Sequence, residues 1–374
     1  MNLASRKRLL YVKQKSPQFT PAPKLKSTIV SVGTATPPKS YTQAELLNLF
    51  KVEDRRVHSL FLNGAIDRRC LALPPLNESG LFQSETQGEL LDRHRMCAVE
   101  IGARAIQECL RGLNGNISEI SHLCCVTTTG FLTPSLSALL SCELGISNSC
   151  ARLDVVGMGC NAGLNALNTT SCWTLANPGK LAIMLCVEIC SAAYVFDSSV
   201  RSAVVNSLFG DGAAALALRA TDNNNVSAGP AIQRFQSRII TDAIRAMRFD
   251  WDESHGKFSF FLDPNVPYVI GANVEGTIDQ LLLGTGVRRS EIAHWVIHSG
   301  GKKVIDALRV NLGLSVHDLR HTSAVLREYG NLSSASFLFS YERLLSEKII
   351  HPGEYGVMIT MGPGSTIESA LLQW

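Results

Sequence analysis

Cys160 has the sequence context of a nucleophile. It lies in GMGCNAGLNAL (157–167), after a segment expected to be a strand and before one expected to be a helix. The flanking glycines allow a sharp turn and a close approach of substrate. At the start of a helix the backbone dipole favours a thiolate over a thiol, so the context predicts a reactive cysteine. A buried structural cysteine is the alternative interpretation, and it fits most of the other ten of the eleven cysteines.

Two further polar residues extend this chemistry. His298 ends an expected strand, and the Ser-Gly-Gly sequence after it predicts a close backbone approach and a helix start suited to an anion. Asn331, in YGNLSSASFLF (329–339), is either a helix cap or a neutral hydrogen-bond donor pointed into a pocket. A cysteine nucleophile, a histidine base and a fixed donor together predict acyl transfer through a thioester. A metal site is not expected, because HWVIH (294–298) is strand-like and lacks the glutamate of the helical zinc motif.

An alternation of strands and helices is expected to position these residues. Thr42 and Glu45 have the spacing of a capping box, which predicts a helix start. The alternation predicts an α/β protein with sheet inside, helices outside and a weak two-fold repeat. Expected strands cover 27–32, 123–127, 153–156, 180–187, 213–218, 292–297 and 355–361. Expected helices cover 93–113, 161–176, 273–283 and 302–312, with a last helix after Gly362-Pro363-Gly364.

Charge and composition divide the chain and exclude several classes of protein. Of its 374 residues, 1–26 hold seven basic residues and no acid, which favours a flexible arm. A connection near 221–230 predicts an N-terminal half at 27–228 with the nucleophile and a C-terminal half at 229–374 with His298 and Asn331. Outside the arm, 28 basic and 32 acidic residues give a net charge of −4, so a nucleic-acid partner is not expected.

The cysteines and the apolar stretches bear on the compartment. The eleven cysteines are scattered and lack disulfide or zinc spacing, so a reducing cytoplasm is expected. The most membrane-like stretch, 181–196, is short and contains Glu188. It predicts a buried strand continuing into a loop, with no association with a membrane.

The motifs together resemble the chalcone and stilbene synthase family, the type III polyketide synthases of the thiolase fold, over nearly the whole chain after the arm. In that family Cys, His and Asn form the catalytic set, and Cys160, His298 and Asn331 lie in the matching motifs. LFGDGAAA (208–215) and FSFFLDPNVP (258–267) resemble the segments that carry two gatekeeping phenylalanines, here Phe209 and Phe260. GPGSTIES (362–369) matches the family's loop beside the active site, which implies a role for Gly362, Pro363 and Gly364.

The resemblance is strongest to a bacterial subgroup, through segments such as HLCCVTTTGFLTPSLSALL (122–140), which contains Thr128, Thr129 and Thr133. Plant members usually have a proline where this chain has Ser299, and a methionine reaching into the partner subunit where it has Thr133. The subgroup implies a malonyl starter, three decarboxylative extensions with malonyl-CoA and cyclisation to 3,5-dihydroxyphenylacetyl-CoA, for antibiotic-type secondary metabolism. It also implies a homodimer without a carrier protein, and no resident cofactor, because coenzyme A thioesters are the substrates.

Residue roles follow from the resemblance in the same way. The His298 imidazolium is expected to lower the thiol pKa of Cys160, and His298 and Asn331 to stabilise an enolate. Gly300 and Gly301 match backbone positions near the pantetheine arm. Arg55, Arg56, Arg68 and Arg69 fall in the region that binds the CoA phosphates, although solvated charges are the alternative.

Other functions remain open from the sequence. An alkylresorcinol or tetrahydroxynaphthalene type of type III synthase would have the same catalytic set, because cavity volume distinguishes them. A ketoacyl synthase that uses a carrier protein would need a basic docking patch, which the acidic body does not offer. A catalytically dead acyl-CoA-binding subunit is disfavoured by the retention of all three polar residues.

Overall fold

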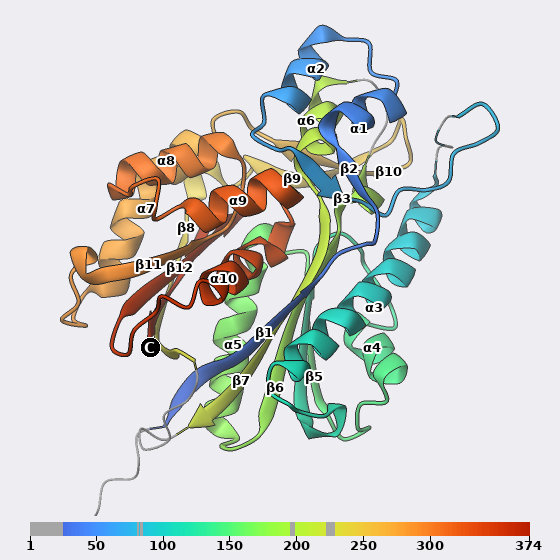
Figure 1. The fold of residues 1–374 in the computed structure, drawn as a ribbon. Helices are drawn as coiled ribbons and strands as arrows, with labels where there is room; N and C mark the ends of the chain where they lie inside the picture. The colour runs from blue at the N-terminus through green and yellow to red at the C-terminus, as the bar shows by residue number, and fades with distance from the viewer. Residues whose placement is uncertain (1–24, 81, 83–84, 195–198, 222–228) are drawn as a thin grey trace, which may run out of the picture.

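One mixed sheet organises the computed structural model, which describes residues 25–80, 82, 85–194, 199–221 and 229–374. Its strands are β1 (Lys26–Ala35), β4 (Ile120–Thr127), β5 (Ala151–Val156), β6 (Leu181–Ile189), β7 (Asp211–Thr221), β8 (Ala231–Ile239), β11 (Ile292–Ile297), β12 (Tyr355–Gly362) and β13 (Thr366–Gln373). Their order is β11-β12-β13-β8-β1-β7-β6-β4-β5 (Figure 1). The sheet therefore contains strands from both predicted halves.

The two halves of this sheet repeat one pairing pattern. From the middle outward, β1–β7 and β7–β6 are antiparallel, and β6–β4 and β4–β5 are parallel. On the other side, β8–β13 and β13–β12 are antiparallel, and β12–β11 is parallel. The halves meet where β1 pairs with β8. The predicted two-fold α/β architecture is thus confirmed, while the predicted boundary at 228 lies outside the described residues, as do residues 1–24 of the predicted arm.

Helices cover the sheet and lie between its halves. The helices are α1 (Gln43–Leu49), α2 (Arg55–Leu62), α3 (Gln87–Arg111), α4 (Leu136–Leu144), α5 (Ala162–Ala176), α6 (Val200–Leu208), α7 (Val266–Leu282), α8 (Lys302–Leu312), α9 (Arg320–Tyr329) and α10 (Ser336–Ser346). Helix α3 packs on β1, β6 and β7, whereas α7 packs on β8 and β13. Helices α5 and α10 contact strands of both halves, so they form the central layer. The small residues of α5 suit this crowded position, since Ala162, Gly163 and Ala166 are all buried there.

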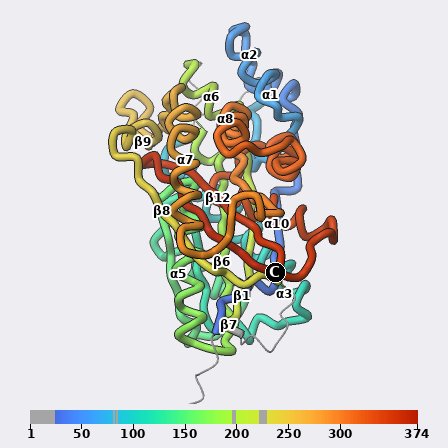
Figure 2. The backbone as a smooth tube through the Cα atoms, turned by 90° about the vertical axis from the view of Figure 1, so that its left-hand side faces the viewer, coloured from blue at the N-terminus to red at the C-terminus, as the bar shows by residue number. Residues whose placement is uncertain are grey.

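Smaller elements gather at one end of the sheet. The hairpin of β9 (Met247–Asp252) and β10 (Lys257–Leu262), and the pair β2 (Ser40–Thr42) and β3 (Arg68–Cys70), lie near α1, α2 and α6 (Figure 1, Figure 2). Helix α1 begins at Thr42 with the predicted capping box to Glu45. No helix in the described part of the chain is both long and apolar enough to cross a bilayer.

One predicted element is wrong. The segment after Gly362-Pro363-Gly364 is the strand β13, not a helix. It forms a hairpin with β12 and also pairs with β8, and every residue from Thr366 to Leu372 is buried. Hydrogen bonding along both edges and burial on both faces outweigh the local sequence pattern, which carried no strand alternation.

Candidate active site

The nucleophile turn joins β5 to α5. The 3-10 turn η2 (Gly159–Asn161) places Cys160 directly before the helix, as predicted. The backbone N–H of Gly159 donates to the hydroxyl of Thr128 at 3.0 Å. A Cβ on Gly159 would lie 2.2 Å from Pro363, and one on Gly362 would lie 2.4 Å from the Asn161 side-chain oxygen. The Gly-Pro-Gly loop therefore packs against the turn so closely that only glycine fits at these two positions.

The sulfur of Cys160 belongs to a buried hydrogen-bonded chain. Its thiol donates to the Ser333 hydroxyl at 3.5 Å, and Ser333 donates to the Glu188 carboxylate at 3.2 Å. Glu188 is fully buried and also accepts hydrogen bonds from Ser334 and from the backbone of Thr128 and Thr129. Since the single Ser333 proton is directed at Glu188, the serine oxygen is left to accept from the thiol.

Burial shifts the pKa values of Cys160 and His298, the predicted catalytic pair. It raises the pKa of the Cys160 thiol to about 12, and the nearby charge of Glu188 acts in the same direction. Burial also lowers the pKa of His298 to about 3. The expectation that an imidazolium lowers the thiol pKa is therefore corrected. Burial therefore favours the neutral form of each group, because neither charge is solvated there.

His298 follows β11 and is held mainly by packing. Its backbone N–H donates to Ile359 on β12 at 2.9 Å. Its ring is buried, and the ring Nδ1 has no hydrogen-bond partner among the described residues. Ser299, the residue that replaces the usual proline, donates to the carbonyl of Gly330 at 3.4 Å. This contact ties the histidine turn to the residue that precedes Asn331.

Asn331 caps the turn that follows it, and its role as a donor pointed into the pocket stays a prediction. Its side-chain oxygen accepts from the backbone of Ser333 at 2.8 Å, as a capping residue does. Its side chain also hydrogen bonds toward Cys160 in the direction that lowers the thiol pKa. With the oxygen occupied, the amide NH2 is the group that faces the sulfur as a donor.

A narrow cavity of about 30 Å³ opens beside the sulfur of Cys160. Phe209 and Phe260 wall it, with ring centroids 5.7 Å apart and an interplanar angle of 89°. Edge-to-face rings of this kind form a stable apolar wall that excludes water. The other lining residues include Thr128, Thr129, Cys190, Ala193, Ser333 and Pro363. The structure thus brings Cys160 together with five of the predicted substrate-binding residues.

The remaining predicted residues lie around this core or away from it. Gly300 lies against the His298 ring, 3.2 Å from it for a built Cβ, and Gly301 has a φ of 131° beside Leu208. Gly364 forms the hairpin turn after Pro363, with a φ of 77°. Thr133 is exposed before α4. Thr133 was predicted to contact a partner subunit, and the glycines to contact substrate. Both stay predictions.

The arginines predicted to bind CoA phosphates have different environments. Arg55 and Arg56 are exposed at the start of α2, and Arg56 pairs with Asp54 at 2.7 Å. Arg68 is also exposed, so a phosphate can reach all three. The prediction that Arg69 binds a CoA phosphate is wrong, because its side chain is 0% exposed and is hydrogen bonded to other protein groups.

Sequence reasoning missed Glu188, Ser333 and Cys190 as parts of the site. Glu188 is the single acid in the apolar strand β6. In the sequence, this acid was used only as an argument that 181–196 does not span a membrane. A carboxylate kept inside a buried strand indicates bound partners, which the structure identifies as the hydroxyls and N–H groups around Cys160. Ser333 lies two residues after Asn331, and its role depends on a turn that spacing alone does not specify.

Comparisons with known proteins identify the family of this chain. The N-terminal domain of chalcone and stilbene synthases matches residues 16–222, and the C-terminal domain matches 242–374. The 3,5-dihydroxyphenylacetyl-CoA synthase of Streptomyces toyocaensis is 60% identical over 349 residues, covering 92% of this chain and 90% of the relative. The synthase of the same name from Amycolatopsis orientalis is 60% identical over 343 residues, covering 92% of each.

A solved structure shows the same architecture. The 1,3,6,8-tetrahydroxynaphthalene synthase of Streptomyces coelicolor A3(2), a bacterial type III polyketide synthase, superposes with a TM-score of 0.84 at 26% identity. The match covers 93% of this chain and 99% of that one. The chain therefore belongs to the chalcone and stilbene synthase family, as a type III polyketide synthase that transfers acyl groups by decarboxylative condensation.

Proposed function

We propose that this protein condenses four malonyl-CoA and cyclises the chain to 3,5-dihydroxyphenylacetyl-CoA, for antibiotic-type secondary metabolism. The observation that carries the proposal is the buried Cys160 beside a narrow cavity walled by Phe209 and Phe260, in a chain 60% identical to synthases of that product.

The neutral resting pair fits the loading step. When malonyl-CoA binds, the imidazole of His298 takes the thiol proton as the sulfur attacks the thioester carbonyl, and coenzyme A leaves with that proton. The malonyl group is then held as a thioester on Cys160. Burial favours a neutral His298, so one ring nitrogen has a lone pair that can take this proton while negative charge moves onto the thioester oxygen.

Extension requires an enolate. A second malonyl-CoA loses carbon dioxide, and its electron pair moves to the thioester oxygen. The Asn331 amide and the His298 ring N–H stabilise that oxygen, each donor contributing about 3 kcal/mol. The enolate carbon attacks the Cys160 thioester, which frees the sulfur and leaves the longer chain on coenzyme A. Before each further round the chain is transferred back to Cys160 and coenzyme A leaves. Three extensions, ring closure with loss of water, and loss of the starter's carboxyl group as a fourth carbon dioxide give the eight-carbon acyl group of the product.

We also propose a homodimer through the edge of the sheet. Strand β5 is at the edge, and an unpaired edge strand requires cover. Val156, Met158 and Phe131 are 42%, 39% and 74% exposed in this region, beside the exposed Thr133. A second copy of the chain would bury this surface, and light scattering of the purified protein tests its mass.

No carrier protein is needed in this scheme, because malonyl-CoA enters directly. A reducing cytoplasm suits the eleven cysteines, all of which are free thiols. Purified protein with malonyl-CoA as its sole substrate, analysed by mass spectrometry, tests the proposal. We expect dihydroxyphenylacetyl-CoA or its acid. Products that form only after addition of a fatty or aromatic acyl-CoA would favour another type III synthase.

A further inference from the structure

Arg69, the arginine excluded from phosphate binding, has an unusual environment. Its guanidinium is fully buried on β3 and donates to three neutral acceptors. These are the side-chain oxygen of Gln43 at 2.8 Å, the hydroxyl of Tyr194 at 2.8 Å and the backbone carbonyl of Phe209 at 2.6 Å. Burying a cation without strong partners costs free energy. A guanidinium in this environment therefore indicates a role that depends on its hydrogen-bond geometry.

The stem of the same side chain contacts the segment that carries Asn331. A Cβ on Gly330 would lie 2.8 Å from Cδ of Arg69 and 2.6 Å from the carbonyl of Leu208. The backbone of Asn331 in turn bonds on both sides of Phe209, donating to Leu208 at 2.9 Å and accepting from Gly210 at 3.0 Å. Arg69 therefore touches both the phenylalanine wall of the cavity and the strand-like segment that holds the catalytic amide.

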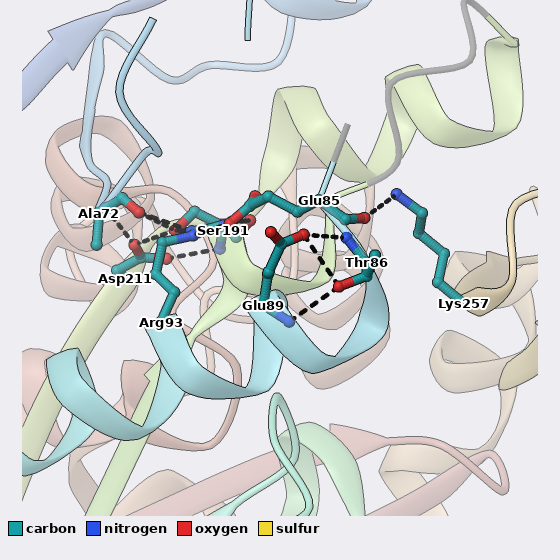
Figure 3. Close-up of polar contacts among 8 residues, drawn as sticks. All are labelled: Ala72, Glu85, Thr86, Glu89, Arg93, Ser191, Asp211 and Lys257. Carbon is teal, nitrogen blue, oxygen red and sulfur yellow. Dashed lines mark hydrogen bonds and ion pairs between the residues drawn. The ribbon is translucent and has the colours of Figure 1, made fainter. Parts of the chain in front are cut away.

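A second anchor fixes the chain that follows Phe209. It is Asp211, two residues further on. Asp211 accepts from the backbone of Ala72 at 2.6 Å and from the hydroxyl of Ser191 at 2.6 Å, beside Arg93 (Figure 3). Arg93 donates to the carbonyls of Ala72 and Ser191 in this cluster. Asp211 is held by this cluster, and the Phe209 carbonyl is held by Arg69. The contact with Arg69 therefore determines how the chain from Phe209 to Asp211 is placed against Asn331.

We propose that Arg69 is a positioning residue that holds Phe209 and Asn331 at a fixed spacing, so that the enolate is used for condensation. This inference rests on the proposed decarboxylative condensation. Loss of carbon dioxide from malonyl-CoA leaves an enolate carbon that either bonds to the Cys160 thioester or takes a proton from water to give acetyl-CoA. A displaced Phe209 admits water, and a displaced Asn331 misaligns the enolate.

The test measures acetyl-CoA formed per molecule of product in the full-length enzyme. For Arg69→Gln we expect product formation to fall about 10- to 100-fold, because small misplacements at a reacting centre have effects of that size. Decarboxylation should fall much less, so the ratio of acetyl-CoA to product rises. Arg69→Lys keeps the charge but has a single ammonium nitrogen in place of the planar fork, so it should give an intermediate ratio.

Matched variants separate positioning from loss of stability or charge. Leu110→Ala removes a buried side chain at the far end of α3, and Arg111→Gln removes an exposed arginine that is 72% accessible. Both should leave the ratio unchanged. Tyr194→Phe removes one hydroxyl that also donates to the Phe209 carbonyl, so it should raise the ratio slightly even if Arg69→Gln does not fold.

The positioning role is overturned if the ratio of acetyl-CoA to product is unchanged in both Arg69→Gln and Tyr194→Phe. It is also overturned if Arg69→Gln loses decarboxylation and product formation in equal proportion, as Leu110→Ala does. If Arg69→Gln is unfolded, an unchanged ratio in Tyr194→Phe overturns it alone. A wild-type protein that does not decarboxylate malonyl-CoA at all would instead contradict the proposed function. The two failures are therefore distinguishable.

Discussion

The turns that carry Cys160 and His298 both follow parallel strands, yet they are held in different ways. Around Cys160, the backbone is crowded by Gly362 and Pro363, and the sulfur is bonded through Ser333 to Glu188. Around His298, the ring is enclosed without a partner for its Nδ1 among the described residues. The cysteine turn is fixed by close backbone packing and a hydrogen bond of the sulfur, whereas the His298 ring lacks a partner for Nδ1 among the described residues.

This difference explains the protonation states. Burial and the negative charge of Glu188 both raise the pKa of the Cys160 thiol, and they outweigh the hydrogen bonds with Ser333 and Asn331, which lower it. The apolar enclosure of His298 stabilises a neutral imidazole. Burial thus favours a neutral thiol and a neutral imidazole, which fits the proposal that proton transfer from the sulfur occurs in the loading step.

Replacement of the nucleophile is expected to have the largest effect. Cys160→Ala should abolish transfer of radiolabel from malonyl-CoA to the protein and lower product formation by more than about 1000-fold. Cys190 lines the same cavity, so Cys190→Ala is the matched control and should retain labelling. Label that persists on the Cys160→Ala protein would show that another group accepts the acyl chain.

The second effect distinguishes the two donors. His298→Gln should slow decarboxylation of malonyl-CoA by about 100-fold, as for loss of a donor at a developing oxyanion. Asn331→Asp should slow it less, because the new side chain still accepts from the Ser333 N–H and keeps the turn, and a carboxyl buried there favours its protonated form, which has an O–H donor. Carbon dioxide release reports both rates. Undiminished release in both variants would contradict the donor roles.

Added methyl groups compare the two turns directly. Gly362→Ala would place Cβ 2.4 Å from the Asn161 side-chain oxygen and 2.9 Å from the Cys160 nitrogen, so the nucleophile must shift. Gly300→Ala would meet the His298 ring at 3.2 Å, where a slight movement suffices. We expect about a tenfold loss of product for Gly362→Ala, and a clearly smaller one for Gly300→Ala. Equal losses would show that the histidine turn is as crowded as the cysteine turn.

Much of this arrangement follows from local sequence. The strand 292–297 and the helix 302–312 have the predicted bounds, because apolar runs and a Gly-Gly turn delimit them. The nucleophile position follows from glycines on both sides of Cys160 in a strand–helix context. The cavity walls Phe209 and Phe260 came from resemblance, since a phenylalanine in an apolar segment has no local feature that separates a wall from a core.

Contacts between distant segments could not be predicted in the same way. β13 is a strand because β12 and β8 pair with it on both sides, which no window of sequence contains. Arg69 is buried because Gln43, Tyr194 and Phe209, far apart in sequence, converge on it. The thiol pKa depends on burial and on Glu188, so the helix start alone predicted the wrong direction.

The smallest expected effects report the state of the sulfur. With a thiol pKa of about 12, alkylation of Cys160 by iodoacetamide, followed by mass spectrometry, should rise about tenfold per pH unit from pH 7 to pH 10. A preformed thiolate–imidazolium pair would instead give a nearly flat profile.

The Ser333 hydrogen bond lowers the pKa of the Cys160 thiol and the Glu188 charge raises it. Ser333→Ala should therefore slow alkylation, and Glu188→Gln should accelerate it. Each change should be roughly two- to tenfold, the range expected for one hydrogen bond. Shifts of the same sign in both variants would mean that the thiol responds to loosened packing, and not to these two partners.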